Sequence, residues 1–250
     1  MADTGMYCVI TGAAGGIGRV LVKAFTEAGY GVIGLDRISL PDGIDCRYWI
    51  KHDLAALVND ETRATEVVGQ VSEIVGEAGL HVLINNAAVQ VLGGVQSLSR
   101  ANWQQTLDVN LTAPFFLAQG LFSLLERARG SVINIGSIHA QLTKKNFVAY
   151  ATSKAALAGL TRVMAVDIGN KIRVNGIEPA AIDTDMLRIG FAANPDKFDS
   201  LRMFHPASSI GRPEDVARAA LFLSCGDSKF INGCIINVDG GIRGVLHDPD

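Results

Sequence analysis

The sequence predicts an α/β fold, a doubly wound parallel sheet of about seven strands with helices on both faces. Three observations predict this class. Short apolar runs alternate with longer segments of helical periodicity, which is the pattern of repeated strand–helix–strand units. The apolar runs are nearly continuous, as in strands that helices bury on both faces. The length of 250 residues is usual for one such domain, which can bury about three-quarters of its unfolded surface.

We expect seven strands, one at each apolar run, at residues 7–10, 31–35, 47–50, 81–84, 131–135, 173–177 and 235–238. Helices should fill most of the segments between them. One long gap, residues 183–212, has no clear strand or helix pattern and contains Pro195 and Pro206. Because so long a loop in a compact domain is usually functional, we interpret it as a lid over the substrate. No second domain is evident, so residues 1–250 are expected to form a single domain.

The composition excludes several classes of protein. The 22 basic and 25 acidic residues give a net charge of −3, which argues against a nucleic-acid-binding protein. With 48% hydrophobic and 19% charged residues, the chain does not have the composition of a disordered protein. The longest stretch without charged residues, 78–99, contains Asn85, Asn86 and two glutamines. A membrane-spanning helix is therefore not expected.

The N-terminus and the spacing of the cysteines argue against three further features. The N-terminus has Asp3 and no basic region before an apolar stretch, so a secretory signal is not expected and the cytoplasm is the default location. The four cysteines are far apart, without paired spacing or clustered histidines. Neither a disulfide framework nor a metal site is therefore expected.

A glycine-rich turn gives the first indication of chemistry. Residues 7–18 read YCVITGAAGGIG, a buried strand followed by a turn that contains Gly12, Gly16 and Gly18, and helical periodicity continues to Ala28. Such a turn places backbone N–H groups and a helix N-terminus against a pyrophosphate, and glycine allows the phosphate to approach closely. The turn, with Ile17 in it, is therefore predicted to bind a dinucleotide. A tight turn without a ligand is the alternative for this feature alone.

An acid ends the second predicted strand. Asp36 lies 18 positions beyond Gly18, near the place where dinucleotide-binding folds hold ribose hydroxyls with a carboxylate. An isolated Asp after a strand is more often a turn former or a helix cap, but in combination with the glycine turn the ribose interpretation is favoured. An acid at this position favours NAD over NADP.

Four polar residues further along the chain suggest proton transfer. Asn110 lies in an apolar helical segment, where burial of an Asn without a task would be costly, and Ser137 follows the strand at 131–135. Tyr150 and Lys154 are four positions apart at the start of a helical segment, which places them on one helical face. A phenol has a pKa of about 10, so a neighbouring cation helps it to act as a base near neutral pH. By itself, this Tyr–Lys spacing is common on solvated helices.

Together these features resemble the short-chain dehydrogenase/reductase family. The resemblance extends from about Tyr7 to Gly241 and rests on motifs in the family's order and spacing, namely TGxxxGxG at 11–18, NNAA at 85–88, Asn110, Ser137, YxxxK at 150–154, PxxIxT at 179–184, GRPED at 211–215 and VDGG at 238–241. It implies a Rossmann-like domain, a nicotinamide cofactor and, usually, a homotetramer.

The resemblance also implies roles for particular residues. Tyr150 corresponds to the catalytic acid/base, and Lys154 to the residue that lowers the pKa of that tyrosine and holds the nicotinamide ribose. Ser137 corresponds to the hydroxyl that steadies the substrate oxygen, and Asn110 to the residue that positions a water in a proton relay behind Lys154. The implied cofactor contacts are Gly12, Gly16 and Gly18 at the pyrophosphate, Asp53 at the adenine, Asn86 at the adenosine-side ribose, and Ile182 and Thr184 at the nicotinamide carboxamide.

Two departures from the family pattern stand beside the expected cofactor site. Ala88 and Ala180 each occupy a position where the family usually has glycine. Because alanine at positive φ is strained by roughly 1 kcal/mol or more, we expect ordinary backbone dihedrals at both positions and a slightly tighter nicotinamide pocket. The sequence does not name the substrate, and the candidates for substrate contact whose roles stay open are His139, Lys144, Lys145, Asp185, Arg188 and His205.

The favoured function is an NAD-dependent dehydrogenase that moves a hydride between the cofactor and a secondary alcohol or ketone, with Tyr150 as acid/base. An NADP-dependent carbonyl reductase, with Arg37 on the 2′-phosphate, is the nearest alternative, and Asp36 argues against it. A dinucleotide-sensing protein without turnover is a third hypothesis, which the presence of all four catalytic candidates disfavours. A serine hydrolase built on Ser137 is disfavoured because the Gly-x-Ser-x-Gly pattern is absent. The expected partner is a small alcohol or ketone, with no nucleic acid and no membrane.

Overall fold

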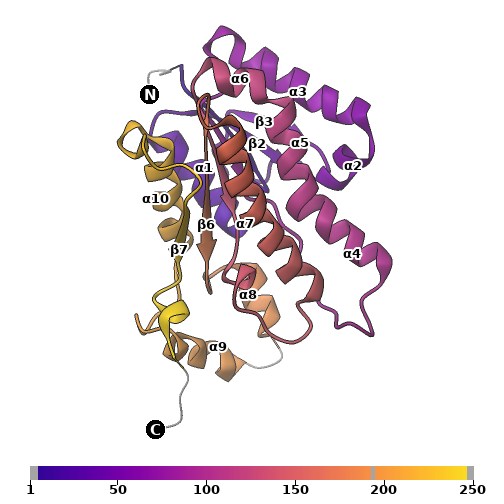
Figure 1. Cartoon of the computed structure of the whole chain (residues 1–250), viewed down its shortest axis with the longest axis vertical. Helices are drawn as coiled ribbons and strands as arrows, with labels where there is room; N and C mark the ends of the chain where they lie inside the picture. Colours follow the sequence, from indigo (N-terminus) through magenta and orange to yellow (C-terminus); the bar gives the residue numbers. More distant parts are fainter. Residues whose placement is uncertain (1–4, 193–194, 247–250) are drawn as a thin grey trace.

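The computed structural model describes residues 5–192 and 195–246. Its centre is a seven-stranded parallel sheet with helices packed on both faces (Figure 1). The strands are β1 (Tyr7–Thr11), β2 (Gly31–Asp36), β3 (Tyr48–Lys51), β4 (Val82–Asn85), β5 (Ser131–Ile135), β6 (Arg173–Pro179) and β7 (Ile235–Val238). The predicted fold class and the seven predicted strands are confirmed, with strand ends displaced by two residues at most.

The order of the strands creates a crevice at one edge of the sheet. The order is β3-β2-β1-β4-β5-β6-β7, so the chain moves outward from β1 in one direction and from β4 in the other. Val9 of β1 pairs with Leu83 of β4, and Ile10 pairs with Ile84. The segments that follow β1 and β4 therefore leave the sheet side by side. In open α/β sheets, ligands bind beyond the carboxyl ends of the strands at such a switch point.

Two layers of helices cover the sheet. Helices α1 and α10 pack on one face, and α3, α5 and α7 pack on the other, where α2, α4 and α6 extend the layer (Figure 1). The bounds are α1 (Gly16–Glu27), α2 (Leu54–Asn59), α3 (Glu61–Val75), α4 (Arg100–Leu107), α5 (Ala113–Gly120), α6 (Phe122–Arg127), α7 (Val148–Ile168) and α10 (Pro213–Ser224).

Alternate residues of each strand enter separate hydrophobic cores. In β1, Val9 packs with residues of α3, α5 and α7, whereas its neighbours Cys8 and Ile10 pack with residues of α1 and α10. All three side chains are fully buried. Because apolar side chains are needed on both faces of such a strand, the runs in the sequence are continuous rather than alternating.

Helix α1 is anchored by one apolar face and has an open N-terminus. Its buried residues are Gly18, Leu21, Val22 and Phe25, a spacing of three and four that places them on one side of a helix. No side chain caps the first turn, and no acidic residue lies in it. The first N–H groups of a helix have no partner within the helix, so in α1 they are available to a ligand.

The segment 183–212 is not the irregular loop that its sequence suggests. It contains α8 (Asp185–Gly190), α9 (Pro195–Leu201) and a 3₁₀ turn, η4 (Arg202–Phe204). The prediction of an unpatterned gap was wrong because helices of six and seven residues have too few turns to show a hydrophobic period. Two local signals were present, since Thr184 accepts a hydrogen bond from Leu187 N as the N-cap of α8, and Pro195 opens α9 where proline is tolerated. Figure 1 places both helices beyond the ends of the strands.

Two absences hold for residues 5–192 and 195–246. No helix in these ranges combines the length and the apolar content that crossing a bilayer requires. No group of three or more His, Cys, Asp or Glu side chains there is arranged to hold a metal ion. The four cysteines are free thiols.

Candidate functional site

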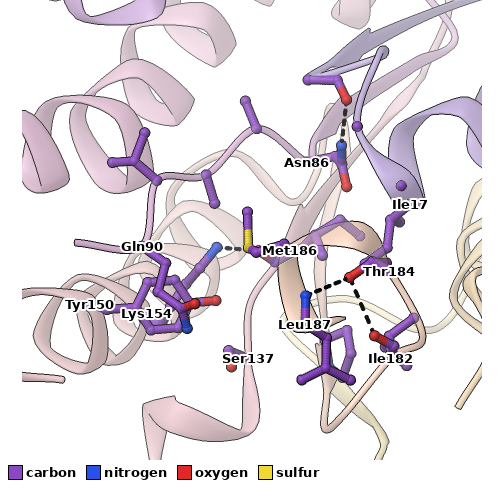
Figure 2. A pocket seen from close by; sticks show the side chains of 18 of the residues that line it. Ile17, Asn86, Gln90, Ser137, Tyr150, Lys154, Ile182, Thr184, Met186 and Leu187 are labelled. Carbon is purple, nitrogen blue, oxygen red and sulfur yellow. Dashed lines mark hydrogen bonds between the residues drawn. The ribbon is translucent and has the colours of Figure 1, made fainter. Parts of the chain in front are cut away.

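A cavity of about 840 Å³ lies beyond the carboxyl ends of the strands, at the switch point of the sheet. Its lining combines the glycine turn, the segments after β2, β3, β4 and β5, the start of α7, and residues of α8. In Figure 2, Asn86 and Thr184 lie on one side of the cavity, and Tyr150 and Lys154 lie on the other. The structure therefore brings the predicted dinucleotide-binding residues to one site with Ser137, Tyr150 and Lys154.

Each glycine of the turn is required by a different neighbour. Gly12 has a φ of +63°, and a Cβ there would lie 2.8 Å from Ala87 Cα. A Cβ on Gly18 would overlap the carbonyl oxygen of Gly12, so this glycine allows α1 to pack against the turn. A Cβ on Gly16 would lie 2.8 Å from Thr184 Cβ and Cγ2. Gly16 therefore also admits the start of α8, a contact that the sequence does not reveal.

The turn fits the pyrophosphate of a dinucleotide. Gly15, Gly16, Ile17 and Gly18 line the cavity, and the N-terminus of α1 has no side-chain cap. Backbone N–H groups and the positive end of the helix dipole therefore face the cavity where glycines leave room for a ligand. No described acid of the first turn competes for these groups.

Asp36 ends β2 at the cavity wall. Its carboxylate accepts hydrogen bonds from Ala14 N at 3.0 Å and from Ile38 N at 3.4 Å, so the side chain is held in place beside the glycine turn. Arg37 lines the same part of the cavity. This arrangement offers carboxylate oxygens to ribose hydroxyls and places one guanidinium beside them.

Asp53 and Asn86 also line the cavity, but their side chains support the local backbone as well. Asp53 caps α2 by accepting a hydrogen bond from Ala55 N at 2.9 Å. Asn86 donates from Nδ2 to the carbonyl oxygens of Thr11 and Gly12 at 2.9 and 3.1 Å. Asn86 thus ties the end of β4 to the turn after β1, as Figure 2 shows in part.

Tyr150 lies in the first turn of α7 and faces Ser137, which follows β5. The tyrosine is 9% exposed and the serine 7%, and both line the cavity. Burial raises the pKa of the Tyr150 phenol, and a hydrogen bond with the Ser137 hydroxyl opposes this rise. Ser137 Oγ also accepts from His139 N at 3.2 Å, which fixes the position of the hydroxyl.

Lys154 lies one turn after Tyr150 and is 2% exposed. Its Nζ donates to the carbonyl oxygen of Ile135 at 2.7 Å and lies 5.8 Å from the centre of the Tyr150 ring. Burial lowers the pKa of Lys154 to about 8, and the nearby carboxylate of Glu178 opposes this change. The ammonium is thus held near the Tyr150 ring by a backbone carbonyl.

Asn110 does not line the cavity. It lies in a π-helical turn, η2 (Asp108–Thr112), between α4 and α5, and it is fully buried. Its side chain accepts from Val89 N at 2.8 Å and donates to Val89 O and Ser153 Oγ, each at 3.0 Å. Asn110 therefore joins the segment after β4 to α7. π-helical turns are frequent at functional sites, but the sequence shows only the buried Asn.

Ile182 and Thr184 close the cavity over the glycine turn. Ile182 bridges to Gly211 and is 5% exposed. Thr184 Oγ1 donates to Ile182 O at 3.3 Å. Both residues line the cavity, as do Met186, at the centre of Figure 2, and Leu187.

Several lining residues were not singled out from the sequence. They are apolar or neutral and come from four segments: Gln90, Leu92, Gln105, Leu142, Phe147, Met186 and Phe191. No sequence motif marks these residues, because they come from separate segments and have no regular spacing along the chain. Of the open candidates, His139, Lys144 and His205 line the cavity, whereas Lys145, Asp185 and Arg188 are not part of its lining.

The two alanines that replace family glycines have the dihedrals that were predicted. In the described ranges the non-glycine residues with positive φ are Arg129, Asn146 and Ser208. Ala88 and Ala180 are not among them, and both line the cavity. The methyl groups therefore narrow the cavity without backbone strain.

Comparison with known proteins identifies relatives along nearly the whole chain. The family described as enoyl-(acyl carrier protein) reductase matches residues 12–243. Gluconate 5-dehydrogenase of Gluconobacter oxydans is 32% identical over 244 residues, which cover 96% of this chain and 95% of the relative.

Solved structures agree with these sequence matches. Ligand-free aldohexose dehydrogenase of Thermoplasma acidophilum is 30% identical, with a TM-score of 0.89 over 98% of this chain and 96% of the other. A complex of 4-hydroxyisoleucine dehydrogenase with NADH is 28% identical, with a TM-score of 0.86 over 96% of this chain and 100% of the other. Another similar structure contains NADP.

The family match, the relatives and the parallel sheet agree with the resemblance seen in the motifs. The chain belongs to the short-chain dehydrogenase/reductase family of Rossmann-fold, NAD(P)-dependent oxidoreductases.

Proposed function

We propose that this protein is an NAD-dependent dehydrogenase that transfers a hydride between the cofactor and a secondary alcohol or ketone, with Tyr150 as the acid/base. The observation that carries the proposal is the position of the Tyr150–Ser137 pair, with Lys154 buried behind it, in the same cavity as the glycine turn. Relatives named for gluconate, aldohexose and 4-hydroxyisoleucine support a hydroxyl-bearing substrate.

Each side chain has a distinct task in this proposal. The bound nicotinamide supplies the site that accepts or donates the hydride. Tyr150 exchanges a proton with the substrate oxygen, and the hydroxyl of Ser137 holds that oxygen in place. Because the pKa of Lys154 is about 8, its ammonium is charged at pH 7 and stabilises negative charge that develops on the phenol. Asn110 positions α7 by bonding to Ser153, and we propose that it also holds a water of the proton relay.

The proposed contacts to the cofactor follow from the lining of the cavity. Gly12, Gly16, Ile17 and Gly18 would hold the pyrophosphate, Asp53 the adenine, Asn86 the ribose on the adenosine side, and Ile182 and Thr184 the carboxamide. Lys154 would contact the nicotinamide ribose.

We propose that NAD is preferred because of Asp36. NADP carries an additional phosphate of about −1.5 to −2 charges. Two like unit charges about 4 Å apart repel by roughly 1 kcal/mol in bulk water and by roughly 4 kcal/mol near a protein surface. Arg37 lines the cavity beside Asp36. Binding of the 2′-phosphate by its guanidinium would favour the alternative, an NADP-dependent carbonyl reductase. A dinucleotide sensor without turnover is the alternative from another class, and the placement of Ser137, Tyr150 and Lys154 together in the cavity gives no support to it.

Three further proposals concern the molecule as a whole. We propose a single domain in which α8 and α9 act as the lid, a homotetramer, and a cytoplasmic location. Exposed apolar residues support association through helical faces, since Val163 and Val166 of α7 are 66% and 87% exposed and Phe115 and Phe116 of α5 are each 38% exposed. Sedimentation velocity would test the tetramer.

The test of this function is an absorbance assay of cofactor reduction. Polyols, sugars, cyclic alcohols and hydroxy acids are offered with NAD and with NADP to the parent, Asp36→Ala and a control, Asp42→Ala, whose side chain is exposed and does not line the cavity. We expect a preference for NAD of about tenfold or more in the parent, a relaxed preference in Asp36→Ala and no change in the control. Equal use of both cofactors by the parent, or an unchanged ratio in Asp36→Ala, would remove Asp36 from the ribose site.

A further inference from the structure

A second lysine besides Lys154, Lys144, lines the cavity near Tyr150 and forms no ion pair within the described residues. Lys144 lines the cavity, and in residues 5–192 and 195–246 no carboxylate oxygen lies within 4.0 Å of its Nζ. The ammonium instead lies 4.8 Å from the ring centre of Phe147 and 6.0 Å from that of Phe191. Lys144 is exposed, and its ammonium lies near these two aromatic rings at the cavity wall.

The ring of Phe147 lies near both Lys144 and Tyr150, the proposed acid/base. The ring centre of Phe147 lies 6.1 Å from that of Tyr150, in an edge-on arrangement. His139 stacks on Phe147 at 4.4 Å and lies 5.8 Å from the Tyr150 ring. Burial and the charge of Lys144 lower the pKa of His139 to about 4. His139 is therefore neutral at pH 7, and the positive charge at this wall belongs to Lys144.

Other charged groups at the site have partners or lie elsewhere. The carboxylates that line the cavity are at the end proposed for adenosine, where Asp36 ends β2 and Asp53 follows β3, and Arg37 lines the cavity beside Asp36. Lys154 is bound to the Ile135 carbonyl. Arg188 pairs with Asp183 at 2.7 Å and is not part of the lining. Among the cations of the described residues that line the cavity, Lys144 is thus the one near Tyr150 that is open to an anionic substrate.

From this placement, and on the basis of the function proposed above, we propose that Lys144 binds a carboxylate of the substrate. The enzyme then acts on hydroxy acids, or on the corresponding oxo acids, in which a short carbon chain separates the carboxylate from the carbon that reacts at Tyr150. Leu142, Phe147 and Met186 supply apolar walls for that chain. A carboxylate is favoured over a phosphate ester because phosphate sites use bidentate arginine or several donors, and here one ammonium is present.

The test compares substrates that differ only in the proposed anion. The pairs are 3-hydroxybutanoate with butane-1,3-diol, 4-hydroxypentanoate with pentane-1,4-diol, and gluconate with glucitol, and glucitol 6-phosphate serves as the phosphate arm. The ratio of kcat/KM for acid and diol is measured for the parent, for Lys144→Met and for Lys145→Met. Lys145 is the matched control because it is the adjacent exposed lysine but does not line the cavity.

We expect the parent to prefer at least one acid to its diol, and Lys144→Met to reduce that ratio about ten- to a hundredfold, as for loss of a charge-assisted hydrogen bond. The loss should appear mainly in KM, and Lys145→Met should keep the ratio of the parent. An unchanged ratio in Lys144→Met, or a general preference for diols, would overturn the inference. A preference for the phosphate that depends on Lys144 would overturn the choice of a carboxylate.

A binding measurement separates this inference from the proposed function. Calorimetry with the same acids and diols is carried out on the enzyme saturated with NADH, so that no turnover is needed. If acids bind more weakly to Lys144→Met than to the parent while no substrate reacts, the carboxylate site stands and the dehydrogenase proposal fails. If diols react in a Tyr150-dependent manner and acids bind both proteins equally, the dehydrogenase proposal stands and the carboxylate site fails.

Discussion

Burial shifts the pKa values of Tyr150 and Lys154 so that the uncharged form of each side chain is favoured. The pKa of the phenol is raised and the pKa of the ammonium is lowered to about 8, because the protein interior disfavours the charged form of both groups. The Ser137 hydroxyl and the Glu178 carboxylate each oppose one of these changes. The site therefore keeps an ionisable pair in an environment that costs free energy of folding.

Lys154→Met tests that cost directly. The folded-state pKa of about 8 lies below the value of 10.5 for an unperturbed lysine, so the buried charge destabilises the fold by at most about 3 kcal/mol at pH 7. Loss of the hydrogen bond to Ile135 lowers the stability of the variant by about 1 kcal/mol and offsets part of the gain from removing the charge. We expect urea denaturation at pH 7 to give a higher free energy of unfolding for the variant, together with loss of turnover.

The dependence on pH distinguishes charge from packing in this variant. Between pH 8 and 10.5 the unfolded parent holds a proton on Lys154 that the folded parent has released, so this contribution to stability rises with pH across that window. Lys154→Met should lack the rise, and Lys145→Met should retain it. A variant that is less stable than the parent at pH 7 would show that the charge is not the dominant cost.

Among the elements, α8 has the closest contact with the glycine turn. Gly16→Ala places a Cβ 2.8 Å from the side chain of Thr184, the N-cap of α8. Overpacking costs about 1–3 kcal/mol, and α8 can move more easily than the sheet. We expect NADH binding, followed by fluorescence titration, to weaken about tenfold with little loss of thermal stability.

Gly159→Ala is the control for Gly16→Ala. Gly159 lies in α7 and has no atom within 4 Å of an added Cβ, so alanine should leave NADH affinity unchanged and stabilise the helix by about 0.5–1 kcal/mol. If Gly16→Ala binds NADH as tightly as Gly159→Ala, α8 does not depend on a glycine at position 16.

Elements with long or buried patterns could be predicted from the sequence, and short ones could not. The central strands give runs of apolar residues because both of their faces are buried, and the edge strands β3 and β7, although only partly buried, are also mostly apolar, so all seven were predicted. Most of the side chains of α8 and α9 whose burial is described are exposed, and both helices are too short to show a period. Asn110 in the π-helical turn makes side-chain hydrogen bonds to Val89 and Ser153, partners that are distant in the sequence.

At the scale of the whole molecule, an ion pair of Arg243 joins the C-terminal segment to β6. In η6 (Ile242–Gly244), it pairs with Glu178 of β6 at 2.7 Å, and the two side chains are 14% and 1% exposed. Arg243→Met would leave the Glu178 carboxylate buried without this partner, and removal of one member of such a pair costs about 3–5 kcal/mol. We expect a corresponding loss of stability in chemical denaturation.

The double variant separates the ion pair from packing. Arg243→Met combined with Glu178→Gln removes both charges, so most of the stability lost in Arg243→Met should return. If the double variant is as unstable as the single one, Arg243 supports the fold through its packing and not through the ion pair.

The site as a whole could be predicted only where one short segment carries the chemistry. The glycine turn, Asp36 and the Tyr150–Lys154 pair are local patterns, and the structure places all of them in one cavity. Lys144, Phe147 and Phe191 come together only when the loop before α7 meets the end of α8. Their contact is a property of the folded chain, so sequence patterns alone left Lys144 as one open candidate among several.

The role of Tyr150 as acid/base is tested most directly by the turnover of Tyr150→Phe at saturating NAD, measured beside its affinity for NADH. The variant removes the ionisable oxygen and keeps the ring that packs against Phe147 and His139. We predict NADH affinity within about twofold of the parent and a loss of turnover of about a hundredfold or more, as for removal of a general acid/base. Turnover close to that of the parent, with NADH bound normally, would show that Tyr150 is not the acid/base.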